Sequence, residues 1–190
     1  DMKKNAIQTI GIIGLGLMGT SIGMALKKSG TAIRITGFTR SRFNGTQALE
    51  KGAVDTLSLT VAELIGAADL IILATPIHAI ITLLARVGAF AHSPILVTDT
   101  GSTKVEIYEA ARRLPAHITF IGGHPLAGKE VSGAKHAEAT LFKNRPWILT
   151  PTETGDRVHL SSLRSLLAQT GAHVLEMSPK DHDRIMTPIS

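Results

Sequence analysis

Residues 7–19 read IQTIGIIGLGLMG, and this stretch decides the fold class. Residues 7–13 form an apolar run with the length of a buried β-strand, and Gly14, Gly16 and Gly19 follow it in the pattern G-x-G-x-x-G. Between a strand and a helix, these glycines permit a tight turn, a close approach of the backbone to a pyrophosphate and close packing of the helix. The phosphates would accept hydrogen bonds from free N–H groups at the helix N-terminus. We therefore predict cofactor contacts from Gly14, Leu15, Gly16, Leu17, Met18 and Gly19.

The rest of the chain alternates strand-like and helix-like segments. We expect further strands at residues 33–38, 69–74, 95–98 and 118–121, and helices at 17–29, 42–51, 61–67, 77–90 and 103–113. Continuous apolar strands separated by helices predict a mainly parallel sheet covered on both faces. The fold class is thus α/β, of the Rossmann-type doubly wound kind. This context favours dinucleotide binding over the alternative, in which the glycines serve only a tight turn.

The periodicity weakens after Gly122. We interpret residues 123–144 as loops with short helices, followed by a strand at 147–149, a helix at 156–169, a strand at 173–175 and a helix from Pro179 onward.

Composition narrows the possible partners. The 190 residues carry a formal net charge of +5 and no cysteine, so thiolate metal sites and disulfides are excluded. The basic residues are scattered and only 4% of residues are aromatic, which argues against a nucleic-acid surface. No apolar run has the length of a membrane span. We expect a cytoplasmic protein that binds a small molecule, without nucleic-acid, membrane or metal partners.

The end of the second expected strand bears on cofactor choice. An NAD-binding chain usually has an acid here, about 20 residues beyond the glycines, to bind the ribose 2′-hydroxyl. This chain instead has Thr39, Arg40, Ser41 and Arg42. A guanidinium attracts a 2′-phosphate that a carboxylate would repel, so we predict NADP in preference to NAD. The alternative is that the two arginines belong to a solvated loop.

Further cleft residues are expected where other strands end, because ligands of such sheets lie outside the carboxyl ends of the strands. Thr75 and Pro76 follow one strand, and Gly101 follows another. Pro76 also suits the first turn of a helix for purely structural reasons.

Two longer motifs lie at the same sheet edge. Residues 98–104 read TDTGSTK and residues 122–128 read GGHPLAG. Together with the glycine motif, in this order and spacing, they resemble the prephenate/arogenate dehydrogenase family. The resemblance extends over essentially the whole chain, and the GGHPLAG segment is its most specific part.

The resemblance implies a chemistry and its residues. The family oxidises a cyclohexadienol: a ring carbon loses hydride to the nicotinamide while the ring loses carbon dioxide and becomes aromatic. By resemblance, His124 is the catalytic histidine, and a neutral imidazole can accept the hydroxyl proton. Ser102 would bind the other side of the imidazole or the nicotinamide region. Glu130 and Asp183 are weaker candidates for contact with the substrate or support of the site.

We predict no metal site. His182 lies between Asp181 and Asp183, but ligands on one helix prefer spacings of three or four residues.

The resemblance also implies a missing part. We assign residues 1–178 to the dinucleotide-binding domain and 179–190 to the start of an interdomain helix that leads to a helical dimerisation domain. The chain would then be a fragment with reduced or no turnover, derived from a homodimeric parent that oxidises prephenate or L-arogenate. Two alternatives stay open: a β-hydroxyacid-type dehydrogenase, and a nucleotide-binding regulatory module without catalysis.

Overall fold

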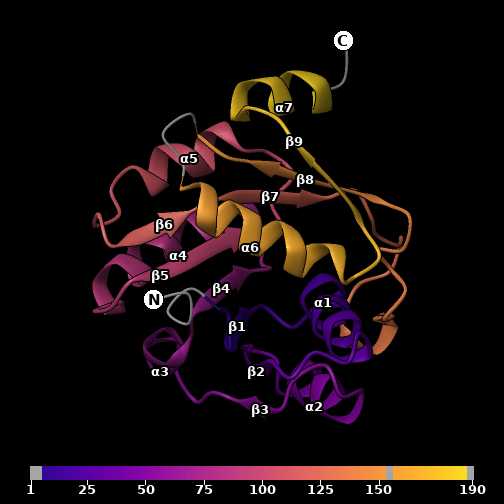
Figure 1. Cartoon of the computed structure of the whole chain (residues 1–190). Coiled ribbons are helices and arrows are strands. Elements are labelled where there is room, and N and C mark those ends of the chain that lie inside the picture. The colour runs from indigo at the N-terminus through magenta and orange to yellow at the C-terminus, as the bar shows by residue number, and fades with distance from the viewer. Residues whose placement is uncertain (1–5, 153–155, 188–190) are drawn as a thin grey trace.

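The computed structural model describes residues 6–152 and 156–187, and its centre is a six-stranded sheet in which every pair of strands is parallel (Figure 1). The strand order is β3-β2-β1-β4-β5-β6. The bounds are β1 Thr9–Ile13, β2 Arg34–Phe38, β3 Thr56–Leu57, β4 Leu70–Leu73, β5 Ile95–Asp99 and β6 Ile118–Phe120. This order, with its reversal between β1 and β4, is that of the doubly wound dinucleotide-binding fold, so the predicted fold class is confirmed.

Helices connect the strands and follow the predicted segments closely. They are α1 Leu17–Lys28, α2 Arg42–Glu50, α3 Val61–Ala67, α4 Ile77–Phe90, α5 Val105–Ala111, α6 Arg157–Ala168 and α7 Pro179–Met186. Several begin at polar residues whose side chains accept hydrogen bonds from the first turn, as Ser41 does from the Asn44 N–H and Ser178 from the Asp181 N–H. Among the shorter elements, the sequence prediction missed the two-residue β3.

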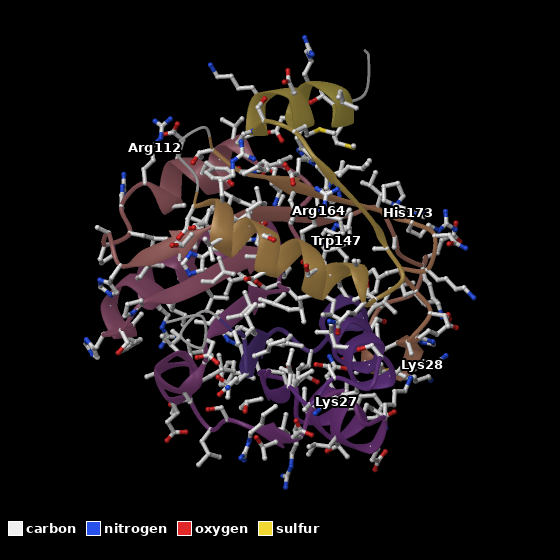
Figure 2. All side chains as sticks on the ribbon, viewed as in Figure 1. Lys27, Lys28, Arg112, Trp147, Arg164 and His173 are labelled. Carbon is white, nitrogen blue, oxygen red and sulfur yellow. The ribbon has the colours of Figure 1, made fainter. Side chains whose placement is uncertain are left out.

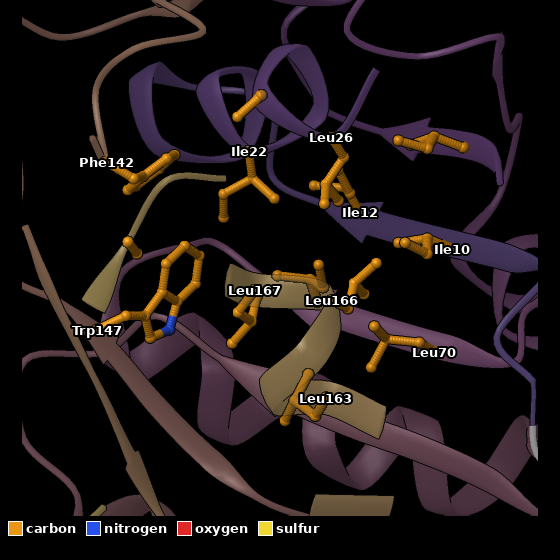
Figure 3. Close-up of a cluster of buried hydrophobic side chains, with 14 of the residues drawn as sticks. Ile10, Ile12, Ile22, Leu26, Leu70, Phe142, Trp147, Leu163, Leu166 and Leu167 are labelled. Atoms are coloured by element: carbon orange, nitrogen blue, oxygen red, sulfur yellow. The ribbon is translucent and has the colours of Figure 1, made fainter. Parts of the chain in front are cut away.

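Alternation along the strands builds a hydrophobic core on each face of the sheet. In β1, Ile10 and Ile12 belong to the core beneath α1 and α6, whereas Ile13 belongs to the core beneath α3, α4 and α5. Successive side chains of a strand point to opposite faces, so a continuous apolar run serves both cores. In Figure 3, Leu163 and Leu167 of α6 lie among Trp147 and the strand residues of the first core.

The segment after β6 corrects the sequence prediction. Residues Gly122–Pro125 form a strand, β7, rather than a loop, and β7 pairs antiparallel with β8, Pro146–Thr150. A last strand, β9, His173–Glu176, runs parallel to β8 and completes a separate three-stranded sheet. A glycine is required in β7 because a Cβ on Gly123 would lie 2.7 Å from the Asp99 carbonyl oxygen at the end of β5.

The surface carries dispersed basic groups. Figure 2 shows Lys28 on α1 and Arg112 next to α5, well separated on the molecule. Some of the cations are paired: Lys27 with Asp55 at 2.6 Å and Arg164 with Glu176 at 2.6 Å. Within the described part of the chain, no helix has both the length and the apolar character needed to cross a membrane.

Candidate functional site

The turn between β1 and α1 has the geometry that dinucleotide binding requires. Gly14 has a φ of 100°, and a Cβ on Gly19 would lie 1.8 Å from the Gly14 carbonyl oxygen, so helix and strand approach too closely for any side chain. A Cβ on Gly16, by contrast, would have no neighbour within 4 Å. Gly16 is also the N-cap of α1 and provides no side-chain cap, so the first N–H groups of the helix remain available. The residues therefore fit a pyrophosphate held against the open side of Gly16.

A cleft of about 430 Å³ lies beside this turn, at the carboxyl ends of β1, β2 and β4. Its walls come from β1, the end of β2, the start of α3, and the β4–α4 connection with the first three turns of α4. The lining residues are Ile13, Gly14, Phe38, Thr39, Arg40, Val61, Thr75, Pro76, His78, Ala79, Thr82, Leu83 and Arg86. Ligands of doubly wound sheets bind at this edge, which supports a nucleotide site here.

The predicted cofactor residues divide at this cleft. Five of them line it: Gly14, Thr39, Arg40, Thr75 and Pro76. The other predicted cofactor residues are absent from its walls, namely Leu15, Gly16, Leu17, Met18, Gly19, Ser41, Arg42 and Gly101. Ser41 instead caps α2, and the exposed Arg42 is the first residue of that helix. The Thr75 hydroxyl is buried without a hydrogen-bond partner among the described atoms, so a ligand could supply one.

His124 lies on β7, next to the carboxyl end of β5. The Gly123 N–H beside it donates to Asp99 Oδ1 at 3.1 Å, which holds β7 at this edge of the main sheet. The imidazole is half-buried, and its Nδ1 lies 2.8 Å from Nε2 of the fully buried His182. His182 Nδ1 in turn lies 2.7 Å from Asp183 Oδ1. Two residues from α7 thus complete the surroundings of His124.

A buried ion pair lies next to His124, His182 and Asp183. Asp99 and Lys104 are both fully buried, and the Lys104 ammonium donates to the Asp99 carboxylate. The same carboxylate accepts from the Gly101 N–H at 2.8 Å, so Gly101 takes part in fixing the turn after β5. Burial raises the pKa of Asp99 and lowers that of Lys104, and the attraction between the two charges opposes both shifts.

These surroundings keep His124 neutral. The pKa of His124 is lowered to about 4, chiefly by burial; repulsion from His182, when that ring is protonated, and from Lys104 acts in the same direction, and the Asp183 carboxylate opposes it. At neutral pH the imidazole therefore has a free lone pair and can act as a proton acceptor.

The other predicted site residues are placed as follows. Ser102 is exposed in the loop between β5 and α5, and the described residues show no hydrogen bond between it and His124, whose Nδ1 bonds to His182 instead. Glu130 is exposed beyond β7. Asp183 accepts from the backbone N–H groups of Lys104 at 2.7 Å and Val105 at 2.9 Å, so it ties α7 to the start of α5.

Sequence reasoning missed three contributors to the site. The sequence analysis considered His182 only as a possible metal ligand, because no pattern in the sequence places α7 against β7. Arg86 and His78 line the nucleotide cleft, and the signal for them was available: with Thr82 they recur every four residues on one face of α4. Among residues 6–152 and 156–187, no three His, Cys, Asp or Glu side chains gather as a metal site would require.

Comparison with known proteins decides the family. The model of the family described as "Prephenate dehydrogenase, nucleotide-binding domain" matches residues 22–176. The chain belongs to the prephenate dehydrogenase family. The prephenate dehydrogenase of Bacillus subtilis is 38% identical over 187 residues, which cover 96% of this chain and 50% of that protein.

Solved structures agree with this assignment. The arogenate dehydrogenase of Synechocystis matches with a TM-score of 0.84 and 38% identity, covering 93% of this chain and 62% of that one. The prephenate dehydrogenase of Aquifex aeolicus, in complex with hydroxyphenyl propionate and NAD⁺, matches with a TM-score of 0.87 and 28% identity over 95% of this chain and 63% of that one. The chain spans about half the length of the curated prephenate dehydrogenases it matches. Membership of this family decides against the β-hydroxyacid dehydrogenase alternative.

Proposed function

We propose that this chain is the cofactor-binding half of an enzyme that oxidatively decarboxylates prephenate or L-arogenate, with NADP preferred over NAD. The observation that carries the proposal is His124: a half-buried, neutral imidazole at the carboxyl edge of a dinucleotide-binding sheet. A regulatory module without catalysis would need no proton acceptor at this position. The curated and solved relatives, named as prephenate, arogenate and cyclohexadienyl dehydrogenases, support the same reaction class.

The residues divide the chemistry between them. When bound, the nicotinamide cofactor supplies the acceptor for the hydride that leaves the ring carbon. His124 accepts the proton of the ring hydroxyl as its oxygen takes on carbonyl character, and returns it when loss of carbon dioxide makes that oxygen phenolic. The proton thus ends on the product, and carbon dioxide is the only group that the ring loses besides the hydride. Gly14, Gly16 and Gly19 would hold the cofactor, and Ser102, which is exposed, would contact its nicotinamide end or the substrate.

Arg40 and Arg86 support the NADP preference. Both line the nucleotide cleft, from the end of β2 and from α4, and neither forms an ion pair with a described residue. Two guanidinium groups without a carboxylate partner in one cleft suit a ligand with an additional phosphate. We assign no contact with the additional phosphate to Arg42, because it is not part of the cleft wall.

The rest of the substrate site is proposed to lie outside this chain. Helix α7 would begin the connection to a second, helical domain that contributes the groups binding the substrate carboxylates and the contacts of a homodimer. Residues 188–190 of the proposed connecting segment lie outside the described structure. Glu130 and Asp183 are weaker candidates for contact with the substrate, and Asp183 already has protein partners.

The test is a His124→Asn variant of the whole protein, assayed for NADPH formation from prephenate and from arogenate. We expect kcat to fall by about 10²–10⁴-fold, the usual contribution of a positioned general base. The dissociation constant of NADP⁺ should stay the same because His124 does not line the nucleotide cleft. His173→Asn, a change at an exposed histidine, serves as the matched control and should retain full activity. Retention of wild-type kcat by His124→Asn would exclude the proposed role.

A further inference from the structure

His182 is a buried histidine that the proposed reaction does not use directly, and its two ring nitrogens both have partners. Its exposed fraction is 0%, its Nδ1 lies 2.7 Å from Asp183 Oδ1 and its Nε2 lies 2.8 Å from His124 Nδ1. The three side chains therefore form a continuous line, Asp183–His182–His124, in which each link has hydrogen-bond length.

The carboxylate end of this line is fixed first. Partial burial alone would raise the pKa of Asp183, but the Val105 N–H, His182 and the Lys104 N–H donate to the carboxylate and hold its pKa below the usual range. Because the Lys104 and Val105 N–H groups belong to the start of α5, Asp183 cannot turn away without breaking both bonds. Asp183 is thus an anchored, ionised acceptor.

An anchored acceptor determines the tautomers of both rings. A carboxylate accepts only, so His182 Nδ1 must carry a proton, and in the neutral ring Nε2 is then left with a lone pair. That lone pair can only accept, so His124 must donate from Nδ1. The proton of neutral His124 is therefore on Nδ1, and its Nε2 is the bare nitrogen.

Resting on the proposed dehydrogenase function, we propose that His182 is a positioning residue that, together with Asp183, holds His124 in the tautomer whose Nε2 accepts the substrate proton. In solution a free imidazole favours no tautomer strongly enough to serve a single reaction geometry, so a fixed partner increases the competent fraction. When His124 takes up the proton, the resulting positive charge faces the lone pair of His182 Nε2 and, beyond it, the Asp183 carboxylate. The Asp183 carboxylate thus favours the protonated form of His124. The buried Lys104 ammonium, which is paired with Asp99, disfavours that form.

A pair of substitutions separates the hydrogen bond from the packing. His182→Gln places an amide oxygen near the position of Nε2 and can still accept from His124. His182→Asn places its amide near the position of Nδ1, can still donate to Asp183, and loses the acceptor toward His124. Both replace a buried ring by a smaller polar group, so a purely structural role for His182 would affect the two variants alike.

The first readout needs no turnover. Nitrogen-15 NMR of the 190-residue chain at pH 7 reports which ring nitrogen of each histidine carries the proton. We expect His124 of the wild type to be protonated on Nδ1, the His182→Gln variant to keep this state, and the His182→Asn variant to shift toward protonation on Nε2. A wild-type His124 protonated on Nε2 would overturn the proposal, whatever the whole protein catalyses.

The second readout is kinetic and uses the whole protein. We expect kcat of His182→Asn to fall about tenfold or more, a part of the 10²–10⁴-fold contribution of the base itself, with KM for the dienol substrate little changed. His182→Gln should recover most of that loss. Equal kcat values for the Asn and Gln variants would refute a positioning role. A wild-type protein with the expected tautomer but without dehydrogenase activity would refute the proposed function and leave the hydrogen-bonded line intact.

Discussion

The buried pair of Asp99 and Lys104 gives the sharpest prediction, because the structure fixes both the geometry and the lack of solvent. Both side chains are 0% exposed, and the Asp99 carboxylate also accepts N–H groups from Gly101 and from Gly123. The substitution Lys104→Met keeps an unbranched side chain that is shorter by the ammonium group, and removes the charge. It leaves a buried carboxylate with backbone partners only.

The expected cost follows from that isolation. Removing one partner of a buried ion pair typically destabilises a protein by about 3–5 kcal/mol, and a domain of this kind has about 5–15 kcal/mol in total. Lys104→Met should therefore lose at least about a fifth of the free energy of unfolding and, at the upper end, all of it. The double variant Asp99→Asn/Lys104→Met should lose less than the two single variants added together, since it leaves no unpaired charge.

The assay is urea unfolding of the chain at several pH values, with Lys27→Met as the matched control. Lys27 pairs with Asp55 at the surface, where the two side chains are 26% and 40% exposed, so its removal should cost no more than about 1 kcal/mol. Without Lys104 the pKa of the buried Asp99 should rise further. The deficit of the variant should then be small at acid pH, where Asp99 is protonated, and grow as pH increases through the folded-state pKa. A cost for Lys104→Met equal to that of Lys27→Met, or one independent of pH, would refute the reasoning.

Three other predictions concern the cofactor turn, His124 and the cleft. Gly19→Ala should destabilise the chain by roughly 1–3 kcal/mol because its Cβ would lie 1.8 Å from the Gly14 carbonyl oxygen. Gly16→Ala has open space around its Cβ, so it should keep the stability of the chain and weaken NADP⁺ binding measured by calorimetry. In a proton NMR titration His124 should stay neutral down to a pH of about 4, and its depressed pKa should cost stability as pH falls from 6.5 to that value, a contribution absent from His124→Asn. Arg40→Ala should weaken NADP⁺ binding about tenfold, or about 1.4 kcal/mol, and leave NAD⁺ binding unchanged. Arg42→Ala, a change outside the cleft, should alter the affinity for neither cofactor. Equal losses of affinity for both cofactors in Arg40→Ala would contradict a contact with the 2′-phosphate.

The sequence by itself determined the doubly wound sheet. Strand-length apolar runs, the glycine motif and the helix caps are local signals, and local signals agree here with the global fold. They placed α1, α2 and α4 to within a residue or two and drew attention to the glycine turn that we propose to bind the cofactor. The motifs around Ser102 and His124 were identified by their resemblance to the family, and sheet topology added that both lie at the edge where parallel strands end.

Tertiary structure alone decided the immediate partners of His124. The sequence analysis placed residues 123–125 in a loop because glycine and proline have low strand propensity, yet pairing with β8 and the close approach to Asp99 make residues Gly122–Pro125 a strand. His182 lies 58 residues farther along the chain, and no periodicity relates it to His124. The contact exists because Asp183 anchors α7 to the start of α5, and such non-local packing is a property of the folded chain that a local pattern does not encode.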